Sequence, residues 1–224
     1  MRNETVHFKP LVKVGGLTLI ERVLHSMAGA GTCEVAVIIN EDSIPVRDHV
    51  TTNPWPFRLR WIIESTPTSM HSFLRLVETL ASDGDKGPFL LSTVDTVAEA
   101  QTYARFIAEA RQFPTAAVAL ALTNPGTDEK PLLVRMAPDA RIIAIGNAAG
   151  PSQYATAGIY AVRPSILSEA NSARAEGIDS LITFLARLLD RGYPIAGIPI
   201  PTSIDVDRPA DIATAEEFLR TATV

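Results

Sequence analysis

Residues 88–96 read PFLLSTVDT, an apolar run that leads directly into one carboxylate, that of Asp95. Gly87 and Pro88 open the run and a predicted helix follows it, which is typical of a parallel strand in an α/β sheet. Ligands bind outside the carboxyl ends of such strands, so the position of Asp95 suits a metal ligand. The competing interpretation is that Asp95 caps the helix that follows, a role that aspartate fills well.

Helix patterns lie on both sides of this run. Thr18 begins a helix over residues 19–27, because Glu21 completes a capping box and apolar residues recur at helical spacing. Before it, Pro10 excludes a helix and two glycines form a turn, so residues 7–16 are predicted to be extended. Further helices are predicted at 70–80, 98–112, 179–189 and 212–219, with a weak helix or irregular chain at 46–50.

The predicted strands indicate an α/β fold. Val35–Ile39 is continuously apolar, which predicts a buried interior strand, and residues 115–122 have the same pattern. Residues 57–63 alternate and are expected nearer the edge of the sheet. A hairpin is predicted from 132–134 and 141–145, and further strands from 154–162, 195–198 and 203–206. The sheet is therefore predicted to be mixed rather than purely parallel.

The composition is that of an ordinary globular chain. Of its 224 residues, 46% are hydrophobic and 20% are charged, so we expect a single domain over residues 1–224. A net charge of -5 argues against polymeric nucleic acid as a partner, although a local basic patch for a phosphate remains possible. The single cysteine, Cys33, excludes an internal disulfide and a thiolate metal cluster. With neither a signal peptide nor a membrane-spanning run, we expect a cytoplasmic protein without a membrane partner.

Three further groups of polar or small residues can each be interpreted either as part of a functional site or as a structural feature. The hydroxyl-rich loop Ser65–Ser69 suits contacts to a nucleobase, but it equally suits the cap of the next helix. Gly158 lies within a predicted strand, where glycine often marks close approach by a ligand or by backbone. Asp205 and Asp207 share one side of an extended strand, so either could be a metal ligand, or Asp207 could be the N-cap of a solvated turn.

Four segments, in this order, resemble the nucleotidylyltransferase family that activates sugar phosphates, alcohol phosphates and related metabolites. Residues 9–24, KPLVKVGGLTLIERVL, resemble the family's lysine-proline-leucine segment and the helix that follows it. Residues 90–96 resemble the strand that delivers a metal-binding aspartate, and residues 156–160, TAGIY, resemble the strand beneath the acceptor. Residues 204–212, IDVDRPADI, resemble the acidic motif that supplies a second metal ligand.

The resemblance implies a three-layer, Rossmann-like α/β/α sandwich with a mixed, mostly parallel sheet. It implies transfer of a nucleoside monophosphate from a nucleoside triphosphate to a phosphorylated small molecule, with Mg²⁺ as cofactor and release of pyrophosphate. An acceptor phosphate is already a nucleophile, so this chemistry needs charge neutralisation more than a general base. The residues implied are Lys9 at the α-phosphate, Asp95 with Asp205 or Asp207 as metal ligands, and Ser65, Thr66, Thr68, Ser69, Thr156 and Gly158 at the substrates. A homo-oligomer is compatible with this family.

One part of the family pattern has no counterpart in the printed sequence. In the family, a first strand and a glycine-rich loop that ends in arginine precede the lysine segment, and Met1-Arg2-Asn3 falls just after that point. Either the natural start lies upstream, or the protein is a relative that lacks the loop. The alternative function is therefore a non-catalytic protein that binds a nucleotide or nucleotide sugar. A sugar-transferring enzyme ranks lower, because Asp95 is the only carboxylate at the end of its strand.

The same comparison predicts a gap in the sheet between Val35–Ile39 and Phe89–Thr93. In the family the first strand lies between these two, and without it each would expose a row of unpaired backbone groups. Three solutions are expected: direct pairing of the two strands, insertion of Val6–Val14, or a strand from another copy of the chain.

Overall fold

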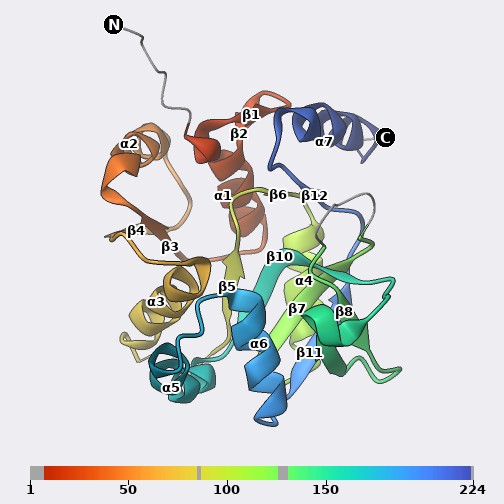
Figure 1. The fold of residues 1–224 in the computed structure, drawn as a ribbon. Helices are drawn as coiled ribbons and strands as arrows, with labels where there is room; N and C mark the ends of the chain where they lie inside the picture. The colour runs from red at the N-terminus through yellow and green to blue at the C-terminus, as the bar shows by residue number, and fades with distance from the viewer. Residues whose placement is uncertain (1–7, 85–86, 126–130, 223–224) are drawn as a thin grey trace, which may run out of the picture.

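The computed structural model describes residues 8–84, 87–125 and 131–222 (Figure 1). Its centre is a four-stranded sheet in the order β11, β7, β10 and β5. β11 runs parallel to β7, whereas β10 runs antiparallel to both β7 and β5, so the predicted mixed sheet is confirmed. The bounds of these strands are β5 Phe89–Ser92, β7 Val118–Thr123, β10 Ala155–Val162 and β11 Ile195–Pro199.

Four two-stranded sheets surround this centre in the described residues. β3 and β4 pair in parallel, and the other three pairs are antiparallel: β1 with β2, β6 with β12, and β8 with β9. The β8–β9 pair is the predicted hairpin. The bounds are β1 Lys13–Val14, β2 Leu17–Thr18, β3 Glu34–Ile39, β4 Arg58–Ile63, β6 Thr96–Val97, β8 Val134–Met136, β9 Ile142–Ile145 and β12 Ile204–Asp205.

Helices cover both faces of the central sheet, which gives the predicted three-layer α/β/α arrangement (Figure 1). One face packs against α3, α5 and α6, and the other against α1, α2 and α4. The α-helices are α1 Leu19–Gly29, α2 Ile44–Thr51, α3 Ser69–Ala81, α4 Thr102–Ala110, α5 Ala170–Ala175, α6 Leu181–Asp190 and α7 Pro209–Ala222. Short 3₁₀ helices are η1 Lys9–Leu11, η2 Glu41–Ser43, η3 Gly146–Ala149 and η4 Pro164–Glu169.

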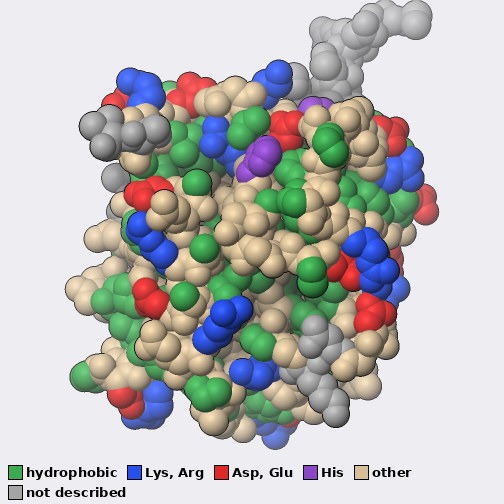
Figure 2. Space-filling view, turned by 180° about the vertical axis from the view of Figure 1, so that it is seen from behind, with side chains coloured by type: hydrophobic (Ala, Val, Ile, Leu, Met, Phe, Trp, Pro, Cys, Tyr) green, Lys and Arg blue, Asp and Glu red, His purple; other side chains and the backbone are tan. Residues whose placement is uncertain are grey.

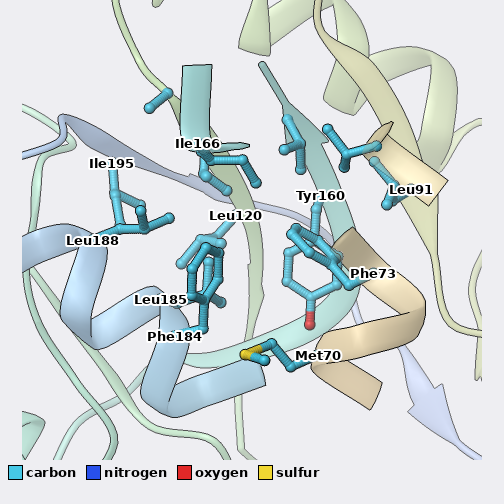
Figure 3. Close-up of a cluster of buried hydrophobic side chains, with 14 of the residues drawn as sticks. Met70, Phe73, Leu91, Leu120, Tyr160, Ile166, Phe184, Leu185, Leu188 and Ile195 are labelled. Carbon is cyan, nitrogen blue, oxygen red and sulfur yellow. The ribbon is translucent and has the colours of Figure 1, made fainter. Parts of the chain in front are cut away.

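The core beneath α3 and α6 shows how the sheet is held (Figure 3). Phe73 of α3 meets the ring of Tyr160 of β10 edge-on, with ring centroids 5.9 Å apart and an interplanar angle of 84°. Phe184 and Leu188 of α6 are fully buried against the same face. The spacing of these residues, three or four apart along each helix, produces one apolar stripe per helix, which is why the helices lie flat on the sheet.

The sequence predicted the first helix well and its surroundings less well. The capping box is present: the N–H of Glu21 donates to the Thr18 hydroxyl at 3.3 Å, and the Glu21 carboxylate accepts from the N–H of Thr18 at 2.8 Å. The prediction that Pro10 excludes any helix was wrong, because η1 contains it in the first turn. Proline is tolerated there, since its missing N–H would have no helical partner.

The segment that follows Asp95 also differs from the prediction. A helix was expected from residue 98, but Thr96–Val97 form β6 and α4 begins only at Thr102, with Gln101 as its N-cap. Asp95 therefore does not cap a helix. β5 was predicted to be a parallel strand, but the partner that it has among the described residues, β10, is antiparallel.

Among the described residues, β3 and β5 do not pair with each other (Figure 1). β3 pairs with β4 and β5 with β10, so each has one strand partner among the described residues. A cavity of about 680 Å³ lies between them, with both strands in its walls. Residues 8–14 do not fill it, because they form η1 and the β1–β2 hairpin; Val6 and His7 lie outside the described residues.

The surface shows no single dominant charge on the face drawn in Figure 2, where basic and acidic side chains are interspersed among hydrophobic and neutral ones. No helix within residues 8–84, 87–125 and 131–222 is both long enough and apolar enough to cross a membrane. The cytoplasmic location stays a prediction from the sequence.

Tyr103 of α4 leads to a prediction about alkaline stability. It is 1% exposed, and its hydroxyl lies 2.6 Å from the Ser92 hydroxyl of β5. Burial raises the pKa of Tyr103 from 10.0 to about 12, although the hydrogen bond to Ser92 acts in the opposite direction. The folded state therefore favours the neutral phenol, and this stabilisation is complete below the unfolded pKa and is lost as the pH rises towards the folded pKa.

We predict that ionisation of Tyr103 lowers the free energy of unfolding by about 2 to 3 kcal/mol between pH 10 and 12. Urea denaturation across this range should show a steeper fall for the wild type than for Tyr103→Phe. Equal slopes for the two proteins would contradict the prediction.

Candidate active site

Three residues from distant parts of the chain meet at the end of the central sheet. The Lys9 ammonium lies 2.6 Å from Asp95 Oδ2 and 2.5 Å from Asp207 Oδ1. The side chain of Asp95 is 26% exposed, that of Lys9 40% and that of Asp207 67%, so the cluster opens to solvent on the Asp207 side. The structure therefore brings together the lysine and two of the three aspartates that the sequence singled out.

A short ribbon of two strands places the two carboxylates. β6 follows Asp95 directly and pairs with β12, which precedes Asp207. The N–H of Val206 donates to the carbonyl oxygen of Asp95 at 3.0 Å, which extends the pairing between the two aspartates. Any shift in the register of this ribbon would therefore separate Asp95 from Asp207.

A small apolar cluster packs this ribbon against β1 and α1, near the amino end of the described chain, and against α7, near its carboxyl end. Val14, Leu19, Val97, Val206 and Ala215 are buried together, from β1, α1, β6, the residue after β12, and α7. The hairpin and α7 are also joined by a hydrogen bond from a backbone N–H at the hairpin turn to a glutamate of α7. Lys9 lies in the 3₁₀ turn just before this hairpin, so the cluster positions all three charged residues.

The two candidate aspartates near the end of the chain have different partners. Asp207 contacts Lys9, whereas the Asp205 carboxylate accepts a hydrogen bond from the Thr96 hydroxyl at 3.1 Å. Asp207 does not cap α7 in the predicted way, because the Asp211 carboxylate accepts from the N–H groups of Asp207 and Arg208 at 3.0 and 2.7 Å. Asp207 and Asp95 therefore contact the same ammonium group.

The electrostatics of the cluster favour a positive charge between the carboxylates. Partial burial acts to lower the pKa of the Lys9 ammonium, but hydrogen bonds to Asp207 and Asp95, together with their negative charges, raise it above its ordinary value. Lys9 is therefore protonated at neutral pH. A position between two carboxylates that holds the ammonium of a lysine is also suited to a different cation, such as a metal ion.

The hydroxyl-rich loop does not reach this cluster through any contact seen among the described residues. The Thr66 hydroxyl lies 2.5 Å from the Ser72 hydroxyl, and the Thr68 hydroxyl lies 2.9 Å from His71 Nδ1. Thr68 is the N-cap residue of α3, but its side chain makes no capping hydrogen bond. The loop instead forms part of a polar pocket of about 380 Å³ that Thr66 lines together with His71. A role of Ser65, Thr66, Thr68 and Ser69 at a base stays a prediction.

Gly158 has a structural reason for being glycine. Its φ is +67°, at an irregularity of β10 between Thr156 and Tyr160. A Cβ atom there would lie 2.3 Å from the Thr96 hydroxyl oxygen and 2.5 Å from that of Thr93. The hydroxyls of Thr93 and Thr96, on either side of Asp95, make a close approach to Gly158, and the predicted approach of a ligand or of backbone stays a prediction. Thr156 is buried, with 8% of its surface exposed. Its predicted contact with a substrate stays a prediction.

The sequence did not identify the hydrogen bonds made by the threonines on either side of Asp95. The hydroxyls of Thr93 and Thr96 lie 2.9 Å apart, and that of Thr96 contacts both the carbonyl oxygen of Ala157, at 3.2 Å, and Asp205. The signal was present in the sequence, because hydroxyl residues flank Asp95 on both sides. What the sequence did not show is that these side chains point back under β10 and join the two acidic segments.

A family model for the MobA-like NTP transferase domain matches residues 2–158, more than half of the chain. The chain therefore belongs to this family of nucleotidyltransferases. No curated protein matched the chain.

Solved structures of low sequence identity share its fold. The inositol-1-phosphate CTP transferase from T. maritima superposes with a TM-score of 0.75 at 16% identity, over 97% of this chain and 91% of that chain. The CMP:2-keto-3-deoxy-manno-octonic acid synthetase complexed with CTP gives 0.70 at 17% identity, over 95% and 92%. The apo form of a UDP-glucose pyrophosphorylase gives 0.75 at 12% identity, over 96% and 91%.

The close approach at Gly158 generates a stability prediction. Gly158→Ala should lower the free energy of unfolding by about 2 to 4 kcal/mol, because the new methyl group meets two hydroxyls in addition to the cost of a positive φ. Gly192→Ala is the matched control, since Gly192 has a φ of +81° and open space around its Cβ position. It should lose only about 1 kcal/mol in urea denaturation. A loss no larger at Gly158 than at Gly192 would contradict the close contact.

Proposed function

We propose that this chain transfers a nucleoside monophosphate from a nucleoside triphosphate to a phosphorylated small molecule, such as a sugar or alcohol phosphate, and releases pyrophosphate. The observation that supports this most strongly is the contact of Lys9 with both Asp95 and Asp207. These residues belong to three of the four segments that resemble the family motifs. Family membership supplies the reaction type, and the cluster supplies a position for it.

The carboxylates suit Mg²⁺ as the cofactor. No group of three or more His, Cys, Asp or Glu side chains in the described part of the chain could hold a metal by itself. Mg²⁺ is commonly bound through one or two carboxylates and completed by water and substrate phosphates, so Asp95 and Asp207 are a sufficient pair. Thr96 would keep Asp205 at the edge of the site, as a neighbouring negative charge rather than a ligand.

The reaction needs neutralisation of the negative charge on the phosphate oxygens more than it needs a general base. An oxygen of the acceptor phosphate attacks the α-phosphorus, a new P–O bond forms, and the bond to the bridging oxygen breaks, so that pyrophosphate leaves with the electron pair. Bound Mg²⁺ would neutralise charge on the triphosphate and acceptor oxygens. Lys9 has three N–H donors, and two contacts to carboxylates leave it able to present an N–H to the α-phosphate. Asp95 and Asp207 would orient the ammonium for this contact.

The base and the acceptor stay open in this proposal. Of the three structural neighbours named above, two have names that specify CTP or CMP and one has a name that specifies UDP-glucose, so a panel of nucleoside triphosphates that includes CTP is the starting point. Ser65, Thr66, Thr68 and Ser69 are proposed for the base side, and Thr156 with Gly158 for the acceptor side.

Asp95 generates the prediction for metal binding. Asp95→Asn keeps the shape of the side chain but removes one of the two charges, so the Mg²⁺-dependent affinity for the nucleotide should fall at least about tenfold. Isothermal titration with the nucleoside triphosphate, with and without Mg²⁺, measures this. Asp139→Asn is the control, because Asp139 forms an exposed ion pair with Arg141 in the β8–β9 hairpin. Equal affinities for the wild type and Asp95→Asn would remove Asp95 from the metal site.

Lys9 generates the prediction for turnover. Lys9→Ala should lower the rate of pyrophosphate release at least about a hundredfold, because a charge aimed at the reacting phosphate is lost. Lys13→Ala, on the exposed side of β1, should retain turnover. The free energy of unfolding should change by no more than about 1 kcal/mol in Lys9→Ala, since the ion pairs are partly exposed. Nucleotide binding by the wild type without any pyrophosphate release would support the non-catalytic alternative.

A further inference from the structure

Thr96 is a buried polar residue that directly follows Asp95. It is 2% exposed, and its hydroxyl has three oxygen neighbours. These are the Thr93 hydroxyl at 2.9 Å, the carbonyl oxygen of Ala157 at 3.2 Å and Asp205 Oδ1 at 3.1 Å. Thr96 therefore joins the end of β5, β10 and β12 beside a candidate metal ligand.

The direction of these hydrogen bonds follows from the chemistry of the partners. A hydroxyl group donates one hydrogen, and a carbonyl or an ionised carboxylate only accepts. Thr96 is therefore the donor to both Ala157 and Asp205, whereas the Thr93 hydroxyl can donate to Thr96. The Asp205 carboxylate is thus oriented towards Thr96 by a hydrogen bond that it accepts.

Asp205 lies in the same ribbon as the two carboxylates that contact Lys9. It pairs across the ribbon with Thr96, and the N–H of the next residue, Val206, donates to the carbonyl oxygen of Asp95 at 3.0 Å. Burial, together with the negative charges of Asp205 and Asp95, raises the pKa of Tyr160 to about 12. The backbone pairing and the shared effect on this phenol both place Asp205 near Asp95.

A third carboxylate would change which ion the site prefers. Mg²⁺ is commonly held by one or two carboxylates and keeps several waters, whereas Ca²⁺ takes about six to eight oxygen ligands in a flexible geometry. The pair of Asp95 and Asp207 suits Mg²⁺, and Asp205 as a further ligand would favour Ca²⁺. The orientation of the Asp205 carboxylate therefore bears directly on metal selectivity.

We propose that Thr96 is a positioning residue that sets the metal selectivity of this site. Its hydroxyl holds the Asp205 carboxylate away from Asp95 and Asp207, so that the site takes Mg²⁺ in preference to Ca²⁺. The inference rests on the proposed function, because it takes Asp95 and Asp207 as the metal ligands. Gly158 belongs to the same arrangement, since a Cβ atom there would meet the Thr96 hydroxyl at 2.3 Å.

Titration with the metal alone, without nucleotide, tests the proposal. MgCl₂ and CaCl₂ are added separately to the 224-residue chain, and the dissociation constants are read from the NMR shifts of the Val97 and Val206 amides, beside the aspartates. Thr96→Val keeps the shape of the side chain but removes the hydroxyl, so Asp205 can turn to the metal. The ratio of Ca²⁺ affinity to Mg²⁺ affinity should then rise at least about tenfold. Thr96→Ser keeps the hydroxyl and should retain the wild-type ratio.

Two further changes show whether Asp205 causes the effect. Asp205→Asn alone should change the ratio by less than about twofold, and the double variant Thr96→Val with Asp205→Asn should return to the wild-type ratio. Thr102→Val is the matched control for a buried threonine. Thr102 is 1% exposed, and its hydroxyl makes no hydrogen bond to the described residues, so this variant should leave the ratio unchanged.

Three results would overturn the proposal: an unchanged ratio in Thr96→Val, a raised ratio that persists in the double variant, or a ratio in Thr96→Ser as high as in Thr96→Val. If Thr96→Val does not fold, Asp205→Asn and Asp207→Asn still decide, because equal losses of Mg²⁺ affinity would make Asp205 a ligand already. An unchanged ratio in Thr96→Val beside a loss of Mg²⁺ affinity in Asp207→Asn would overturn this inference alone. Metal binding that neither Asp95→Asn nor Asp207→Asn affects would overturn it together with the metal site of the proposed function.

Discussion

The ammonium of Lys9 is the contact on which the arrangement of the site depends. Asp95 and Asp207 approach the same nitrogen atom, so without a cation between them they would repel each other by about 1 to 3 kcal/mol at this range, depending on solvent exposure. The β6–β12 ribbon holds the two carboxylates in this position by backbone hydrogen bonds, and the apolar cluster around Val206 holds the ribbon. Backbone pairing and apolar packing therefore hold two like charges beside one ammonium group.

Much of the fold could be predicted from sequence because its signals are local. The capping box at Thr18, the apolar run in β7 and the helical spacing in α6 each indicate one structure, and all three appear close to the predicted bounds. The pairing of the motif segments that contain Asp95 and Asp207 also followed from their resemblance to a family, which carries information about contacts that no local pattern contains.

The remaining features depend on contacts between distant residues. An apolar run does not reveal the direction of its neighbour, so β5 was predicted to be parallel although β10 is antiparallel to it. Asp205 and Asp207 were predicted to share one side of an extended chain, and their partners distinguish them: the Thr96 hydroxyl contacts Asp205, and the Lys9 ammonium contacts Asp207. The hydroxyls after β4 suit a cap in sequence, but Thr68 contacts His71, a partner that the helix itself supplies. The prediction for Pro10 rested on the effect of proline in the interior of a helix, whereas Pro10 lies in the first turn of a 3₁₀ helix.

The place of Asp207 in the chain has a consequence for how the protein is made. Synthesis runs from the amino end, so Lys9, β5 and most of the central sheet are made before β12 and α7. Until those last elements emerge, β6 has no partner in the ribbon, and Lys9 has only one of its two carboxylates. The charged cluster can therefore be complete only after β12 and the start of α7 have been synthesised, when nearly all of the described chain has been made.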